Sequence, residues 1–207
     1  RLRKLRRFAG KRVAAHVFAA GILPSMDYGA GINGVSDKEL HLLQKMAGAA
    51  SANAVSGRSL TASLLLRDDP TWRAATAPIS RWQREVWRAA DPKRWKEDSV
   101  KQNLNLPRCD FNAEQLKEAW DNATMRMHEC YRDDGTPKWS GVRGPVSATV
   151  LSLERINWQA VNEHIWIDDL GARHDLHDVS PSLLSIMLKH SFSRLAERTL
   201  AQKIGDV

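Results

Sequence analysis

The sequence predicts a mainly α protein, a bundle of about six to seven helices with a small β-hairpin near residues 164–176. Two observations support this class. Apolar residues recur at spacings of three and four along most of the chain, which is the period of an amphipathic helix. Capping sequences, prolines and glycines separate these periodic segments. The 207 residues are 43% hydrophobic and 27% charged, as is typical of a globular protein that buries a core.

The first helix is expected over residues 1–20, ending at Gly21 and Pro24. Its expected apolar face consists of Leu2, Leu5, Ala9, Val13 and Val17. The glycine-rich stretch 26–34 is predicted to be a loop, because glycine readily adopts positive φ. Ser36 and Glu39 have the spacing of a capping box and predict the start of a second helix. The expected apolar face of that helix consists of Leu40, Leu43, Ala47 and Ala50.

Asp69-Pro70 predicts the next helix start, with Asp69 as the N-cap and Pro70 in the first turn. The expected apolar face consists of Trp72, Ala75, Ile79, Trp82 and Val86. Pro78 lies inside this pattern, so a kink or two abutting helices are expected there. Asp91-Pro92 predicts a further short helix that extends to about residue 102.

Asn112 and Gln115 predict another capped helix start. The expected apolar face of this helix consists of Leu116, Trp120, Ala123, Met127 and Cys130. The stretch 132–147 is rich in glycine and proline, and predicts a linker between a helical domain at 1–131 and a smaller segment at 148–207.

Within the smaller segment, residues 149–158 predict a short helix, and Asp-Asp-Leu-Gly at 168–171 predicts the turn of the hairpin. Ser180-Pro181 is expected to open a long last helix. Its apolar face consists of Leu184, Leu188, Phe192 and Leu195.

The positive charge of the chain is concentrated at its N-terminus. Seven Lys and Arg residues, which we call the basic arm, precede the first acidic residue, Asp27: they are Arg1, Arg3, Lys4, Arg6, Arg7, Lys11 and Arg12. The other 24 Lys and Arg equal the 24 Asp and Glu in number, so the net charge of +7 is that of the basic arm. This pattern favours one local contact with a polyanion. A nuclear-import patch, a membrane-surface helix and a solvated helix face remain alternatives.

The stretch YRDDG at 131–135 has the Tyr-x-Asp-Asp pattern of a reverse transcriptase active site, where two carboxylates bind metal ions. In polymerases this turn joins two apolar strands, whereas here a helical pattern precedes it and no strand pattern follows. We therefore interpret it as a turn after a helix and expect no catalytic residue. Asp68-Asp69 is interpreted as a helix cap and Asp168-Asp169 as a hairpin turn.

Metal and nucleotide motifs are incomplete. The pairs His128-x-Cys130 and His174-x-x-His177, with Cys109, do not form the two tight pairs that are usual for zinc, and we expect Cys130 to be a core residue. Gly-x-Gly-x-x-Gly at 29–34 follows a helical pattern instead of a strand, so a dinucleotide site is not expected. We predict no metal and no cofactor. Two cysteines indicate a reducing intracellular compartment, and no apolar run is long enough to span a membrane.

Seven of the eight tryptophans fall into two groups. Those on apolar stripes are expected to be core residues: Trp72, Trp82, Trp120 and Trp158. Trp87, Trp95 and Trp139 lie off the stripes among Lys and Arg residues, where they either stack on unpaired bases or cap an edge of the core.

Several stretches resemble non-LTR (LINE-type) retrotransposon reverse transcriptases, in the region after the polymerase palm. "AAGILPSMDYGAGING" at 19–34 resembles the segment after the palm, where a helix ends in an apolar-Leu-Pro run that precedes Tyr-Gly. Residues 144–158 and 180–198 are similar to what some divergent elements carry before their next domain, and residues 68–87 share this character.

The resemblance implies that this chain is the thumb and downstream connection of an RNA-directed DNA polymerase whose palm lies upstream of Arg1. The catalytic carboxylates would then lie in the palm. The implied partners are that palm and RNA or an RNA–DNA duplex, held by the basic arm without sequence preference. The implied location is nuclear or cytoplasmic. Two alternatives stay open: a helical protein-interaction module with the Trp-rich stripes as its groove, and a degenerate element copy without activity.

Overall fold

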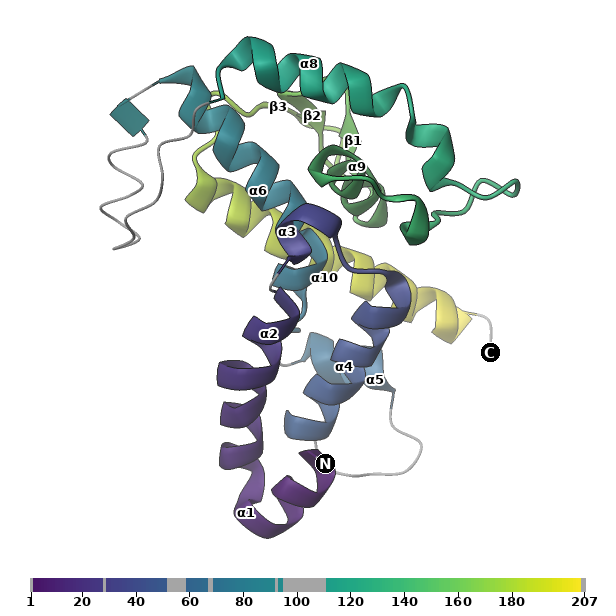
Figure 1. Ribbon diagram of the computed structural model, residues 1–207. Helices are drawn as coiled ribbons and strands as arrows, with labels where there is room; N and C mark the ends of the chain where they lie inside the picture. The colour runs from purple at the N-terminus through teal and green to yellow at the C-terminus, as the bar shows by residue number, and fades with distance from the viewer. Residues whose placement is uncertain are drawn as a thin grey trace.

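The computed structural model describes residues 2–27, 29–51, 59–66, 69–91, 93–94 and 111–205 (Figure 1). The predicted mainly α class is confirmed. The described helices are α1 (Leu2–Val17), η1 (Phe18–Ile22), α2 (Leu23–Asp27), α3 (Ala30–Asn33), α4 (Asp37–Ser51), α5 (Leu60–Leu65), α6 (Trp72–Ala90), α8 (Ala113–Thr124), η2 (Met127–Cys130), η3 (Trp139–Gly141), α9 (Pro145–Arg155) and α10 (Pro181–Gly205). None of the helices in these ranges is long and apolar enough to cross a membrane.

A small antiparallel sheet completes the fold, in the order β1 (Gln159–Ala160), β2 (Ile165–Ile167), β3 (Arg173–Asp175). The hairpin of β2 and β3 confirms the prediction for 164–176, and Ile165 pairs with Asp175 in its register. Strand β1 was not predicted, because a two-residue strand carries too little alternation to be recognised. In Figure 1 the sheet lies with α8 and α9 at one end, and α1, α2, α4 and α5 lie at the other.

The two predicted capping boxes are both formed. Glu39 accepts from the Ser36 amide at 2.9 Å, and Ser36 Oγ accepts from the Glu39 amide at 3.3 Å. Asn112 and Gln115 exchange the equivalent bonds at 3.0 and 2.8 Å. These local bonds satisfy backbone donors that have no partner inside the helix, and so they fix where α4 and α8 begin.

The expected helix over 1–20 is wrong in two respects. Gly10 has φ 84° and ψ 170°, which breaks α1 in its middle, and the chain continues as a π-helix and α2 through Gly21 and Pro24. The predicted apolar face is also wrong, because Val13 and Val17 are exposed. Ala14 and Phe18 are buried instead, because the break at Gly10 ends the single straight helix on which the expected face depended, and Phe18 packs with Ala47 and Ala50 of α4.

Other expected boundaries also shift. Helix α6 begins at Trp72 instead of at Asp69-Pro70, and Asp69 instead accepts from the Thr71 amide at 2.9 Å. It continues as one helix through Pro78, so the expectation of two abutting helices is wrong. The predicted loop 26–34 contains the short helix α3, between Gly29 and Gly34, which have positive φ as expected. The predicted helix after Asp91-Pro92 lies mostly outside the described residues.

The expected apolar faces of α4, α6, α8 and α10 form most of the main core. The buried members of these faces include Leu40, Leu43, Ala75, Ile79, Trp82, Val86, Leu116, Trp120, Leu184, Leu188 and Phe192. The same cluster contains Val146, Leu153, Trp158 and Trp166 from the C-terminal part. A second cluster joins Phe18 to α4 and α5 through Ala47, Ala50 and Leu64.

Residues on both sides of 132–147 therefore share one core, and the division into two domains stays a prediction. The stretch itself contains η3, and α9 already begins at Pro145, inside the expected linker and before the helix expected at 149–158. Close packing at Gly141 fixes this stretch. A Cβ atom at this position would lie 2.1 Å from the carbonyl oxygen of Glu129.

We expect Gly141→Ala to lower the free energy of unfolding by about 1–3 kcal/mol, because the backbone of residue 129 must move to admit a methyl group. Urea unfolding followed by tryptophan fluorescence measures this change. Gly21→Ala is the matched control, because a Cβ atom there meets nothing within 4 Å. Equal stability of the two variants would show that residues 132–147 are a loose linker.

Candidate nucleic-acid interface

The basic arm lies on α1, at the end of the molecule opposite the sheet (Figure 1). Lys4, Arg7, Lys11 and Arg12 are exposed. Arg6 is half-buried and takes part in an intramolecular interaction. Arg1 lies outside the described residues, as does the side chain of Arg3.

The break at Gly10 divides the basic arm into two helical segments. Lys4, Arg6 and Arg7 precede the break, and Lys11 and Arg12 follow it. Among the described residues, no carboxylate forms an ion pair with any of the four exposed cations. Their charge is therefore directed to solvent, where a polyanion can displace counterions from it.

Phe8 lies among these cations and is 85% exposed. Sequence reasoning missed it, although one signal was present: it directly follows Arg6 and Arg7 and lies off the expected apolar spacing. An exposed aromatic ring beside cations offers a face on which an unpaired base can stack. Val13 and Val17 add partly exposed apolar surface to the second segment of α1.

The other candidate stacking rings have partners within the protein. Arg94 lies over the ring of Trp87 at 5.1 Å, and Arg155 lies over the ring of Trp139 at 4.4 Å. Trp139 also packs against Gly34, where a Cβ atom would lie only 2.3 Å from the ring. These contacts favour the core-edge interpretation for both residues, and Trp95 lies outside the described residues.

The tryptophans on the apolar stripes are largely core residues, as expected. Trp82, Trp120 and Trp158 are each at most 4% exposed, and Trp72 packs against the core at its edge. The described rings of these stripes are therefore largely covered by the protein itself, and a partner groove along them stays a prediction.

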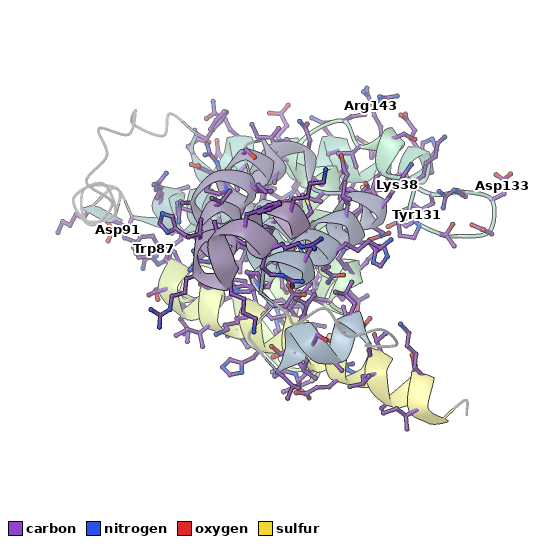
Figure 2. All side chains as sticks on the ribbon, turned by 90° about the horizontal axis from the view of Figure 1, so that it is seen from below. Lys38, Trp87, Asp91, Tyr131, Asp133 and Arg143 are labelled. Carbon is purple, nitrogen blue, oxygen red and sulfur yellow. The ribbon has the colours of Figure 1, made fainter. Side chains whose placement is uncertain are left out.

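The YRDDG stretch forms a turn, as predicted. Asp133 lies at the tip of a loop that points away from the body, and Tyr131 lies at its base (Figure 2). Asp134 accepts from the amide and the hydroxyl of Thr136, and these bonds lower the pKa of its carboxyl. Tyr131 donates to Glu154, and its burial and this carboxylate raise the pKa of the phenol. This geometry is that of a surface turn, with Asp134 occupied in its own loop.

The other Asp-Asp pairs have structural contacts. Asp168 accepts from the amides of Leu170 and Ala172, both at 2.9 Å, and so forms the hairpin turn as predicted. Asp169 was expected to be part of that turn, but its side chain is 0% exposed and binds Arg194 and Arg198 of α10. No local pattern predicts this contact, because Arg194 and Arg198 lie 25 and 29 positions after Asp169. Asp68 lies outside the described residues.

The His and Cys residues of the two incomplete metal motifs have separate partners. The Cys130 thiol is buried and donates to the carbonyl of Gly141, and burial raises its pKa, whereas His128 is exposed. His174 Nε2 lies 2.9 Å from Asp168, and the His174 ring stacks on Trp158. His177 lies instead beside His164, with 4.5 Å between the ring centroids. Cys109 lies outside the described residues.

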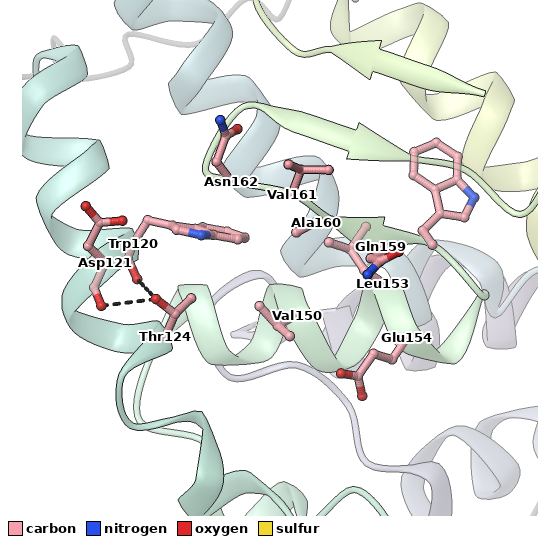
Figure 3. A pocket seen from close by; sticks show the side chains of 11 residues that line it. Trp120, Asp121, Thr124, Val150, Leu153, Glu154, Gln159, Ala160, Val161 and Asn162 are labelled. Carbon is pink, nitrogen blue, oxygen red and sulfur yellow. Dashed lines mark hydrogen bonds between the residues drawn. The ribbon is translucent and has the colours of Figure 1, made fainter. Parts of the chain in front are cut away.

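A pocket of about 410 Å³ opens between α8, α9 and β1 (Figure 3). Two of its polar side chains have partners within the protein: the hydroxyl of Thr124 donates to the carbonyls of Trp120 and Asp121 at 3.0 Å, and Asn162 accepts from the amides of His164 and Ile165. The charged residues that line it, Asp121 and Glu154, are acidic. This pocket therefore does not suit a phosphate.

Comparison with protein-family models, with curated proteins and with solved structures finds no match.

Proposed function

We propose that this chain is a non-catalytic part of a reverse transcriptase-like retrotransposon protein that holds RNA or an RNA–DNA duplex by contacts with the phosphate backbone. The observation that carries the proposal is the group of exposed cations on α1, Lys4, Arg7, Lys11 and Arg12, which have no described acidic partner. Lysine and arginine supply most contacts to phosphate oxygens, and such contacts do not read sequence.

The division of the basic arm at Gly10 supports this proposal. The break gives two short helical segments, and each of them carries exposed cations that can contact phosphates. Phe8, in the first of these segments, adds a ring for an unpaired base at the end of a duplex. The polymerase palm of the parent protein would supply the catalytic carboxylates, and the protein would act in the nucleus or cytoplasm.

The test is equilibrium binding to a fluorescein-labelled RNA–DNA duplex, measured by anisotropy over a series of salt concentrations. The variant replaces Lys4, Arg7, Lys11 and Arg12 by glutamine. We expect the slope of log affinity against log salt to become shallower by about 3 to 4, because each lost phosphate contact reduces it by about 0.9. Two duplexes of different sequence should bind with equal affinity.

The matched control replaces four exposed cations outside α1 by glutamine: Lys38, Lys138, Arg173 and Lys203. Both variants lower the net charge by the same amount, so a difference between them reports position and not total charge. Wild-type affinity and slope are expected for the control. Equal weakening of both variants, or of neither, would contradict a contact through the basic arm.

A protein-interaction module is the second candidate, because Phe8, Val13 and Leu42 expose large apolar side chains. This function predicts concentration-dependent self-association, or binding to the parent palm, that does not respond to added oligonucleotide. Sedimentation with and without the duplex distinguishes the two functions. A complex that forms only with the duplex favours the nucleic-acid function.

A further inference from the structure

We propose that His164, Asp175 and His177 form a binding site for a divalent first-row transition metal ion, with Zn²⁺ as the favoured occupant. One potential ligand atom from each of these residues lies within 4.8 Å of the other two. The site lies at the sheet, away from α1, and is independent of the proposed contact with nucleic acid (Figure 1).

The hairpin fixes the backbone of this cluster. His164 directly precedes β2, and its carbonyl accepts from the Leu176 amide at 2.8 Å. Asp175 pairs with Ile165 in the register of β2 and β3, so it lies next to His164 across the hairpin. The amide of His177 donates to Asp175 Oδ1 at 2.9 Å, and this turn brings the His177 ring onto the His164 ring.

The distances suit coordination of one ion. Two ligand atoms bound tetrahedrally to Zn²⁺ at about 2.0–2.2 Å are about 3.4 Å apart. His177 Nδ1 and Asp175 Oδ1 are 3.1 Å apart, which is close to this value. The His164 ring must move slightly toward them. All three side chains are 26–37% exposed, so the rings have room to rotate and the ion has a path from solvent.

Glu163 has the position of a supporting carboxylate. Its Oε1 lies 3.1 Å from His164 Nδ1. A proton held on Nδ1 by this carboxylate leaves the lone pair of Nε2 as the ligand of the ion, and ligating histidines usually have such a partner. Two imidazole nitrogens and one carboxylate oxygen suit Zn²⁺ and not Mg²⁺ or Ca²⁺, which prefer oxygen ligands. The fourth position would be open to water.

The sequence did not reveal this cluster because its members do not form a tight pair. The close pair in the sequence is His174-x-x-His177, but His174 contacts Asp168 and Trp158. The partner of His177 is His164, which lies 13 residues earlier and reaches it only through the hairpin.

Titration of the metal-free protein with Zn²⁺ by calorimetry tests the proposal. We expect one ion per chain and a rise in melting temperature, because a ligand of the folded state alone stabilises it. His164→Gln and His177→Gln should each weaken binding at least about tenfold. His128→Gln is the control, an exposed histidine outside the cluster, and should bind as the wild type does. Zn²⁺ binding that persists in both ligand variants, or its absence from the wild type, would overturn the site.

Co²⁺ gives a second readout that does not depend on the variants. Bound at this site, it should show the visible d–d absorption of a four-coordinate ion without a thiolate charge-transfer band, because Cys130 takes no part. The spectrum of fully hydrated Co²⁺ would overturn the proposal, as would a thiolate band. Far-UV circular dichroism of the metal-free variants reports whether the fold is retained.

Discussion

Replacing Arg155 by alanine is expected to lower the free energy of unfolding by about 3–5 kcal/mol. The side chain is 8% exposed and connects three parts of the fold. Its guanidinium donates to the carbonyls of Val35 at 2.6 Å and Ala75 at 3.4 Å, and to the carboxylate of Asp37 at 2.8 Å. The guanidinium also covers the ring of Trp139. Alanine would leave the two carbonyls without this donor and open a cavity beside the indole.

The hydrogen bonds to the two carbonyls and the burial of the Arg155 side chain contribute more to stability than the ion pair with Asp37 does. The Arg155 side chain is only 8% exposed, so water has largely been removed from the guanidinium. This burial lowers the pKa of Arg155, and Asp37 opposes that shift. Asp37 is 68% exposed, and an exposed partner contributes little to stability. We therefore expect Asp37→Ala to cost no more than about 1 kcal/mol. Arg155→Lys should fall between the two, because an ammonium cannot reproduce the planar fork.

Urea unfolding of Arg155→Ala, Asp37→Ala and Arg155→Lys measures these differences. Arg143→Ala is the control, because Arg143 is 72% exposed and lies 3.9 Å from Glu129. Its cost should be below about 1 kcal/mol. If Arg155→Ala lowered the free energy of unfolding no more than Arg143→Ala does, the stabilising role given to Arg155 between α9, α4 and α6 would be contradicted.

The substitution Asp169→Asn is expected to lower the free energy of unfolding by about 2–4 kcal/mol. The carboxylate is fully buried and accepts from Arg194 Nε and Nη2 at 2.8 and 2.6 Å, and from Ser191 at 2.6 Å. Ser191 in turn accepts from the indole of Trp158 at 2.8 Å, so this network joins the hairpin turn to α10 and the core. The cost should be lower than for a fully buried pair, because Arg194 and Arg198 are 33% and 44% exposed and can be hydrated.

This network also predicts a pH dependence. The bond from Arg194 is the main cause that lowers the pKa of Asp169 well below its ordinary value of 3.8. Because the folded-state pKa is lowered, the carboxylate stabilises the protein fully above the unfolded pKa. That stability is lost as the pH falls below about 4 toward the folded pKa. Asp169→Asn should remove this contribution at neutral pH and flatten the fall in stability at acidic pH.

Urea midpoints of the wild type and of Asp169→Asn at pH 7 and at several acidic values measure both effects. Asp133→Asn is the control, because Asp133 is an exposed carboxylate in the loop of Figure 2. Its stability should stay within about 0.5 kcal/mol of the wild type. Parallel pH profiles for Asp169→Asn and the wild type would contradict the role given to Asp169.

The sequence predicted well those features that depend on contacts between residues close together in the chain. The capping boxes at Ser36 and Asn112 depend on contacts three residues apart, and the burial of Ile79 and Leu188 follows from helical period alone. The first helix was mispredicted because an isolated glycine inside a helical pattern is usually tolerated. Nothing in residues 1–20 shows that Gly10 takes a positive φ or that Phe18 enters a π-turn.

The contacts that sequence could not supply join distant residues. The hydrogen-bond partners of Arg155 and Asp169 lie at least 22 positions away, and the local pattern had assigned Asp169 to the hairpin turn. His164 and His177 meet only because the hairpin folds back. The exposure of Lys4, Arg7, Lys11 and Arg12 agrees with the sequence-based expectation, because a run of cations without nearby acids has no local partner to bury it.

The most direct test of the proposed nucleic-acid contact maps lysine reactivity. The protein is acetylated briefly with and without a saturating RNA–DNA duplex, and the modified lysines are quantified by mass spectrometry. We expect the duplex to protect Lys4 and Lys11, whereas Lys38, Lys138 and Lys203 should react equally in both samples. If Lys4 and Lys11 stayed fully reactive while the duplex was bound, the contact would lie elsewhere and the role proposed for the basic arm would be wrong.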